Sequence, residues 1–391
     1  MLLKIGIKNL LGAGLRTWLN VFVTSVSFFM IIFMSALYDG MREYAKQVSI
    51  DTEIAGGAYW HPNYDPMDPM TFEDAHSKPP SEISKLIDNN EAFPVLVSQA
   101  SIYPNGRMMP VIMKGIEPNQ ELINLPTKVL NTQNNSYIPV LIGRGMAKYT
   151  KLKEGDTFML RWLDANKTYD ANDGIIVHIM DTENFKVDMG QIWLPIAHLQ
   201  KMLDMPKEAT YVTYKKKISL VENYKDWVPR NVKYLIRDME AIIEADEPNA
   251  AVMYVTLLIL AAIGIFNSQV LSIFRRRKEI GTLMALGMTR TKVVSLFTLE
   301  GGLNAFLAML MTIILFGPVF WYFGIYGIPL PIDYSDMGLI IAKSLIPVYS
   351  ISLFISTAII IASTVLIVSY LPSRKISKMK PTDALRGKIT V

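Results

Sequence analysis

Side chains that commonly carry out catalysis are few and scattered in this chain of 391 residues. The four histidines, at positions 61, 76, 178 and 198, lack the spacing of metal ligands. The sequence contains neither a GxSxG nucleophile motif nor a Walker-type phosphate loop. Cysteine is absent, which excludes disulfides, thiolate metal sites and a cysteine nucleophile. We therefore expect a non-catalytic protein with no cofactor and no metal, so that any ATP would be bound by a partner.

Two aspartates and three prolines are concentrated in residues 61–69, HPNYDPMDP. Carboxylates at this density could bind a cation. The prolines favour an extended, solvated loop instead, because each one removes a backbone donor and fixes φ. We take the solvated loop as the expected structure.

The most informative segment is residues 275–302, where a basic run precedes a short amphipathic helix. Its apolar stripe at helical spacing consists of Ile280, Leu283, Met284 and Leu286. Gly287 is expected to end this helix, and Thr289 to cap the next one. Such a helix fits two roles equally well: docking of a soluble partner, or an ordinary helix on the membrane surface.

Membrane-spanning helices on either side would bring the segment 275–302 to a membrane surface. Four apolar stretches of the sequence are candidates for such helices. Each is long enough to cross a bilayer, which takes about 20 residues. They are residues 17–38, 252–274, 303–326 and 345–371. The only ionisable side chain near the third span is Glu300, at its end. Carriers driven by ion gradients usually place charges in mid-membrane, so a mechanical element, expected to be dimeric, is favoured over a solute carrier.

Charge is divided unevenly by these spans. Residues 1–16, 275–302 and 372–391 hold 15 of the 39 Lys and Arg residues but only 3 of the 35 Asp and Glu residues. Basic residues close to the spans mark the cytoplasmic side. We therefore expect both termini in the cytoplasm, and contact with membrane lipids rather than nucleic acid.

The predicted fold class is a membrane α-helical protein with four transmembrane helices. A mixed α/β extracytoplasmic domain, residues 39–251, is inserted between the first and second helices, with two lobes as one option. Strands at 92–103 and 108–116 flank Pro104-Asn105-Gly106, which predicts a hairpin in a mainly antiparallel sheet. The remaining segments are an amphipathic helix at 1–16, an outside loop at 327–344 and a cytoplasmic tail at 372–391.

The segment RRRKEIGTLMALGMTRTKVVSLFTLEG resembles the signature of FtsX-like permeases of ABC transporters. That signature has a basic run, a REIG-like motif, a short ALG motif and a helix that leads into LxEG. The C-terminal residues 369–387, SYLPSRKISKMKPTDALRG, and the N-terminal residues preceding the first span are similar to the ends of the same family. Residues 114–118 and 138–160 resemble the MacB-like periplasmic core domain, as found in MacB-like exporters and in lipoprotein-releasing permeases of the LolC/LolE kind. Unlike MacB, this sequence shows no fused ATPase domain.

The resemblance implies a permease subunit that works by mechanotransmission in the bacterial inner membrane. A separate ABC ATPase would dock on the cytoplasmic side of a homodimer, or of a heterodimer with a paralogous permease. The implied ATPase-coupling residues are Glu279, Ile280, Gly281, Leu283, Ala285, Leu286 and Gly287. The implied basic anchors are Arg275, Arg276, Arg277, Lys278, Arg374 and Lys375.

The work done outside the membrane would be lipoprotein release or export of hydrophobic or peptide cargo, with a lipoprotein or a periplasmic or outer-membrane protein as partner. Two alternatives stay open. One is a signalling device that activates an extracytoplasmic enzyme, and the other is a membrane-anchored scaffold or sensor without an ATPase.

Overall fold

The computed structural model describes residues 15–132, 137–215, 226–329 and 344–377, and the chain divides into two compact units. The first, here called the helical unit, comprises Met1–Met41, Ile243–Pro329 and Ser344–Val391. The second, here called the α/β unit, comprises Arg42–Ile242 and Leu330–Lys343. The predicted helix at residues 1–16 and most of the predicted tail lie outside the described residues.

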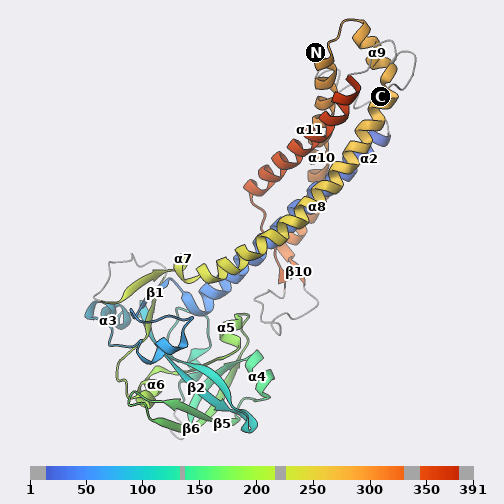
Figure 1. Ribbon diagram of the computed structural model, residues 1–391. Helices are drawn as coiled ribbons and strands as arrows, with labels where there is room; N and C mark the ends of the chain where they lie inside the picture. Colours follow the sequence, from blue (N-terminus) through green and yellow to red (C-terminus); the bar gives the residue numbers. More distant parts are fainter. Residues whose placement is uncertain (1–14, 133–136, 216–225, 330–343, 378–391) are drawn as a thin grey trace. The chain divides into compact units, whose positions relative to one another are not determined.

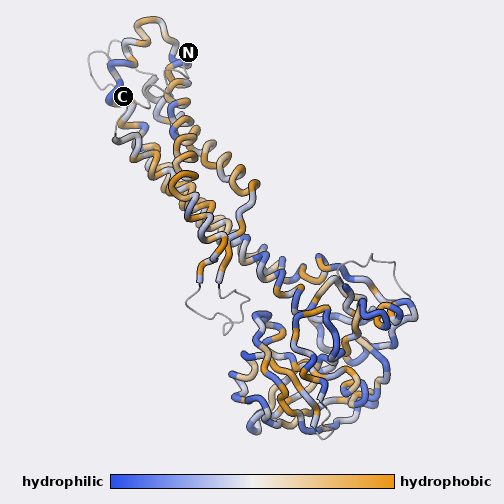
Figure 2. Tube along the Cα trace, turned by 180° about the vertical axis from the view of Figure 1, so that it is seen from behind, coloured by the Kyte–Doolittle hydropathy of each residue, from blue (hydrophilic) through white to orange (hydrophobic). Residues whose placement is uncertain are grey.

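Four long helices run through the helical unit, and each contains a stretch apolar enough to cross a membrane. They are α2 (Leu15–Ser49), α8 (Arg237–Arg275), α10 (Arg290–Tyr326) and α11 (Ile351–Ser377). Apolar residues predominate along all four, whereas polar and apolar residues alternate in the α/β unit (Figure 2). The chain is therefore a multi-pass membrane protein, and the predicted fold class is confirmed.

Aromatic and small side chains hold the helical unit together. Phe29 on α2 stacks on Phe316 of α10 with the ring centroids 4.3 Å apart. Phe320, one turn further along α10, meets Phe354 of α11 edge to face at 5.8 Å. The hydroxyl of Thr312 donates to the backbone carbonyl of Ser25 at 3.1 Å, which joins α10 to α2 by a buried hydrogen bond. Since lipid competes with apolar packing, such close contacts and hydrogen bonds are what keep membrane helices associated.

The α/β unit follows α2 through a short π-helix, Ile50–Ile54. Its strands are β1 (Gly57–Trp60), β2 (Ala92–Tyr103), β3 (Met109–Ile116), β4 (Ile138–Gly143), β5 (Thr157–Leu163), β6 (Tyr169–Met180), β7 (Gln191–Pro195), β8 (Tyr211–Tyr214) and β9 (Val228–Asn231). Its helices are α3 (Ser81–Asp88), α4 (Arg144–Thr150), α5 (Phe185–Asp188), α6 (Ile196–Leu203) and α7 (Val232–Leu235), as drawn in Figure 1.

All nine strands belong to one sheet, in the order β3-β7-β4-β6-β5-β2-β8-β1-β9. Strand β3 also pairs with β2, so β2, β3, β7, β4, β6 and β5 form a closed ring. The predicted hairpin is present: β2 and β3 pair antiparallel, and Asn105 and Gly106 both have positive φ in the turn. Parallel pairs occur between β3 and β7 and between β4 and β6, and the other pairs are antiparallel, as predicted.

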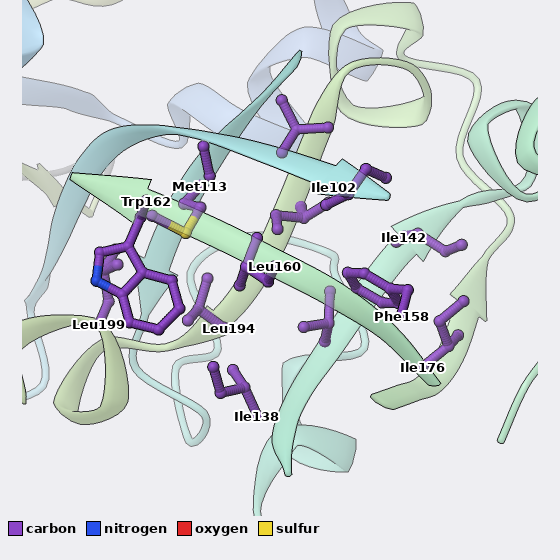
Figure 3. Close-up of a cluster of buried hydrophobic side chains, with 14 of the residues drawn as sticks. Ile102, Met113, Ile138, Ile142, Phe158, Leu160, Trp162, Ile176, Leu194 and Leu199 are labelled. Atoms are coloured by element: carbon purple, nitrogen blue, oxygen red, sulfur yellow. The ribbon is translucent and has the colours of Figure 1, made fainter. Parts of the chain in front are cut away.

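The main core of the α/β unit fills this ring. On β5, Phe158, Leu160 and Trp162 point inward while the residues between them are exposed, because side chains alternate along a strand. Figure 3 shows these three side chains packed with residues from the neighbouring strands and with Leu199 of α6. The indole N–H of Trp162 donates to the carbonyl of Met202 at 3.0 Å, so this buried polar group is satisfied.

Two short strands, β10 (Ile328–Pro329) and β11 (Ser344–Leu345), pair antiparallel between α10 and α11. Ile328, Pro329 and Ser344 belong to the predicted outside loop, whereas Leu345 was predicted to begin the fourth span, whose helix α11 starts at Ile351. Residues 330–343 between them lie outside the described residues.

Candidate functional site

The turn between α8 and α10 is built around the short helix α9 (Arg277–Ala285), at one end of the helical unit (Figure 1). The backbone of Arg276 leaves helical geometry, which separates α9 from α8. At the other end, Gly287 has φ of 97°, and the N–H groups of Gly287 and Met288 donate to the carbonyls of Met284 and Leu283. This is a Schellman cap, which requires a residue that tolerates positive φ. The side chain of Thr289 accepts a hydrogen bond from the N–H of Lys292 and caps α10. Both predicted end signals are confirmed.

One face of α9 is buried. Ile280 is almost fully buried, in a small cluster with Ile273 of α8 and with Val293 and Phe297 of α10. The methionines that flank the C-cap, Met284 and Met288, pack against the same cluster. The helix is therefore fixed to both of its neighbours by apolar contacts.

A charged network fixes the start of α9. The guanidinium of Arg276 donates to both carboxylate oxygens of Glu279, at 2.7 and 2.8 Å. The same group donates through Nη1 to both oxygens of Glu300 on α10, at 3.0 and 2.8 Å. It also lies 4.9 Å from the centre of the Phe297 ring. A planar guanidinium can serve two carboxylates at once, so Arg276 connects α9 to α10.

Interactions within this network favour the charged forms of Arg276 and Glu279, which both lie outside the spans. Hydrogen bonds to Glu279, together with the charge of Glu300, raise the pKa of Arg276. Hydrogen bonds from Arg276 lower the pKa of Glu279, against the opposing effect of partial burial. Arg276 and Glu279 therefore form an ionic pair at neutral pH.

The other face of α9 and its tip are open. The side chain of Leu286, directly before the cap glycine, is 80% exposed although it is apolar. Ala285 and Gly287 beside it are also exposed. An exposed leucine between two small residues leaves room for another surface to approach closely.

The predicted coupling residues therefore divide into two groups. Ile280 and Gly281 are buried and Leu283 is half-buried, and the contacts of Ile280 attach α9 to its neighbours. Glu279 is turned toward Arg276, while Ala285, Leu286 and Gly287 form the accessible tip.

The predicted basic anchors also differ from one another. Arg275, Lys278 and Arg374 are exposed, whereas Arg276 is half-buried against the two carboxylates. The side chains of Arg277 and Lys375 lie outside the described part of the chain.

Sequence reasoning did not anticipate that Glu300 belongs to this site. The sequence did contain an indication of this role. Glu300 is an isolated acid at the end of an otherwise uncharged span, and acids in such places usually pair with another group. The partner could not be named, since many basic residues lie in the same segment. The next residue, Gly301, touches α11: a Cβ at this position would overlap the Ser369 side chain and lie 3.4 Å from Nε2 of Gln269 on α8. The end of α10 that carries Glu300 is thus packed against both neighbouring helices.

Residues 251–381 match the family described as FtsX-like permease C-terminal. This stretch contains α9, Arg276, Glu300, all of α10 and α11, and α8 from residue 251 onward. An uncharacterized ABC transporter permease of Methanocaldococcus jannaschii is 33% identical over 138 residues, which cover 33% of this chain and 30% of that protein. The macrolide export ATP-binding/permease protein MacB of Neisseria meningitidis is 30% identical over 128 residues, covering 33% of this chain and 18% of MacB. The aligned part is less than a third of the length of either relative.

Proposed function

Because residues 251–381 carry the FtsX-like permease C-terminal domain, we propose that this protein is the membrane-spanning subunit of an ABC transporter and works by mechanotransmission. An ABC ATPase docks on the tip of α9 and hydrolyses ATP, while this chain transmits the resulting movement. The observation that carries the proposal is an apolar, exposed tip on a helix that is otherwise locked to its neighbours.

The rigid attachment of α9 is what makes it suitable for transmitting force. A surface helix that merely rests on a membrane needs no buried ion pair. Here Arg276 joins α9 to Glu300 on α10, and Ile280 packs against α8 and α10. A push on Leu286 would therefore move α8 and α10 together with α9.

The long helices are suitable for carrying such movement beyond the membrane. Helix α8 has 39 residues and α2 has 35. At 1.5 Å per residue these lengths are about 58 and 52 Å, whereas the hydrocarbon core of a bilayer is about 30 Å thick. Each helix is thus long enough to continue well outside the lipid. In the sequence, the α/β unit lies between these two helices.

In this proposal both termini and α9 are cytoplasmic, and the α/β unit is extracytoplasmic, in a bacterial inner membrane. The working form is a dimer, either of two copies or with a paralogous permease. Its work is lipoprotein release or export of hydrophobic or peptide cargo. The distribution of basic residues supports the orientation, and the partial similarity to the macrolide export protein MacB supports the transport role.

Replacing Leu286 by Asp tests the docking role. The side chain is 80% exposed, so the substitution should leave folding intact and reduce ATPase co-purification and stimulation at least tenfold. Met70→Asp is the matched control, because Met70 is also 80% exposed but belongs to the α/β unit. If Leu286→Asp retained ATPase binding as fully as Met70→Asp, the docking role would be refuted. Loss of ATPase binding in both would point to a general defect of the chain.

The signalling alternative differs in what lies outside the membrane rather than at α9. If ATPase turnover persists in purified membranes while no lipoprotein or apolar cargo is released, activation of an extracytoplasmic partner replaces transport. If no ATPase associates at all, the scaffold alternative holds.

A further inference from the structure

The α/β unit contains a cavity of about 520 Å³ that is separate from α9. Small-molecule sites usually have volumes of about 300–1,000 Å³. The walls come from the π-helix after α2, from β1, β8 and β9, from α7 and from residues 62–67; Figure 1 shows β1 and α7 in this region. Most of residues 62–67 are exposed, and Met67 is 65% exposed, so the cavity reaches solvent along this segment.

Residues 61–69 were expected to form a solvated loop, and their carboxylates do not gather around an ion. Asp65 accepts a hydrogen bond from the N–H of Met67, and Asp68 accepts one from the N–H of Met70. The two aspartates thus cap turns of their own backbone. Among the described residues, no cluster of three potential metal ligands occurs here or elsewhere.

Aromatic rings form much of the wall, and a guanidinium lies among them. Arg230 on β9 is 4.0 Å from the centre of the Tyr234 ring and 5.7 Å from that of Trp60. Its Nε is buried and has no hydrogen-bond partner among the described residues, and none of their carboxylates pairs with it. A half-buried guanidinium normally has an anion beside it, because its desolvation is otherwise uncompensated.

The acids that line the cavity are already engaged. Glu53 forms an ion pair with the buried Lys114, and Asp238 pairs with Arg237 at 3.3 Å. Asp65 is held by its own turn, as described above. None of these three acids pairs with Arg230, whereas the charge of Lys186, which is exposed at the wall, acts on Glu53.

The remaining wall is apolar or neutral. Burial raises the pKa of Tyr64 and Tyr211 well above the usual tyrosine range, so both stay uncharged phenols. Thr213 is fully buried in the wall, and its hydroxyl has no hydrogen-bond partner among the described residues. The cavity wall thus combines aromatic surface with the guanidinium of Arg230, which has no carboxylate partner among the described residues.

We propose that this cavity binds a single-chain amphiphilic anion, a molecule with a carboxylate or phosphate head and an apolar body. The head pairs with Arg230, and the apolar body lies along the rings of Trp60, Tyr64 and Tyr211. This inference does not depend on the proposed ATPase partner, since it involves the α/β unit alone.

The test uses the full chain in nanodiscs of zwitterionic lipid and the probe 11-bromoundecanoate, whose bromine quenches tryptophan on contact. Trp60 lines the cavity, so binding should give saturable quenching that disappears in Trp60→Phe. Quenching by probe dissolved in the lipid remains in that variant and provides the background. Arg230→Gln should weaken saturable binding at least tenfold, because a hydrogen-bonded charge pair is lost.

Two comparisons make the test decisive. Arg161→Gln is the matched control, because Arg161 also stacks on a tyrosine, 4.2 Å from the centre of the Tyr169 ring, but does not line the cavity. It should bind the probe like the unaltered chain. The uncharged analogue 11-bromoundecanol should bind the unaltered chain at least tenfold more weakly than the acid, and this comparison needs no variant that must fold.

Three results would overturn the proposal. The first is the absence of saturable quenching that depends on Trp60. The second is equal binding of the alcohol and the acid by the unaltered chain. The third is an equal loss of binding in Arg161→Gln and Arg230→Gln.

Discussion

Removing the guanidinium of Arg276 should destabilise the helical unit far more than removing the charge of Glu279, its more exposed partner. In Arg276→Met, Glu300 would lose both hydrogen bonds from Nη1. The Glu300 side chain is only 9% exposed and that of Arg276 21%. Breaking a buried pair from one side costs about 3–5 kcal/mol, and partial access of water to Arg276 favours the lower end, ~3 kcal/mol. The Glu279 side chain is 48% exposed, so Glu279→Gln should cost only ~0.2–1 kcal/mol.

Thermal unfolding of the full chain in detergent measures this difference without an ATPase. For a unit of roughly 150–250 residues, 1 kcal/mol shifts Tm by ~2–4 °C. Arg276→Met should therefore lower the Tm of the helical transition by about 6–12 °C, and Glu279→Gln by no more than about 4 °C.

A double variant supplies the internal control. Arg276→Met with Glu300→Gln removes both members of the buried ion pair, so much of the loss should be recovered, because position 300 no longer carries a carboxylate that has lost its guanidinium partner. A Tm for Arg276→Met within 2 °C of the unaltered chain would refute the role of this network. So would a double variant that loses as much as the two single variants combined.

Three further predictions concern α9, the packing of α10 and the α/β unit. Glu279→Lys should place a second cation beside Arg276 and abolish stimulation of a co-purified ATPase, whereas Glu279→Gln should retain most of it; unchanged stimulation with lysine would contradict the coupling role. Gly301→Ala should cost ~1–3 kcal/mol by overlap with Ser369, whereas Gly317→Ala, with open space around it in the same helix, should not destabilise; Tm values in detergent distinguish the two. Burial raises the pKa of Tyr214 to about 12, above its unfolded value of about 10. The unfolded chain therefore loses this proton first, and stability that is intact below pH 10 should fall between pH 10 and 12; tyrosinate absorbance near 295 nm reports this, and Tyr214→Phe should reduce the loss.

The membrane spans could be predicted well because a bilayer imposes one simple requirement, a long uncharged apolar run. The C-terminal end of α9 and the start of α10 were also predictable, since Gly287 and Thr289 act through their own backbone and nearest turns. The pairing of Arg276 with Glu300 was not, because it depends on how the chain turns between them.

In the α/β unit, too, features set by neighbouring residues were predictable, and features set by distant residues were not. The hairpin follows from Pro104-Asn105-Gly106, which acts locally. The parallel pairs of β3 with β7 and of β4 with β6 join strands that are distant in the sequence, and no local pattern marks them. For the same reason residues 62–67 were expected only to be solvated. That they line a cavity together with Arg230 depends on β1 and β9 lying side by side.

Because six of its strands close into a ring, the α/β unit has few strand edges at which another polypeptide could pair. Each of these six strands has a partner on both sides, so an extended polypeptide cannot join them by strand addition. Within the described sheet, the strand at the open end is β9, which pairs only with β1 and has Pro229 as its second residue. A proline has no N–H to donate, and short edges with proline resist pairing with other chains. A unit built in this way resists recruitment into aggregates through its strand edges, and any polypeptide that binds it has to be held mainly by side-chain contacts.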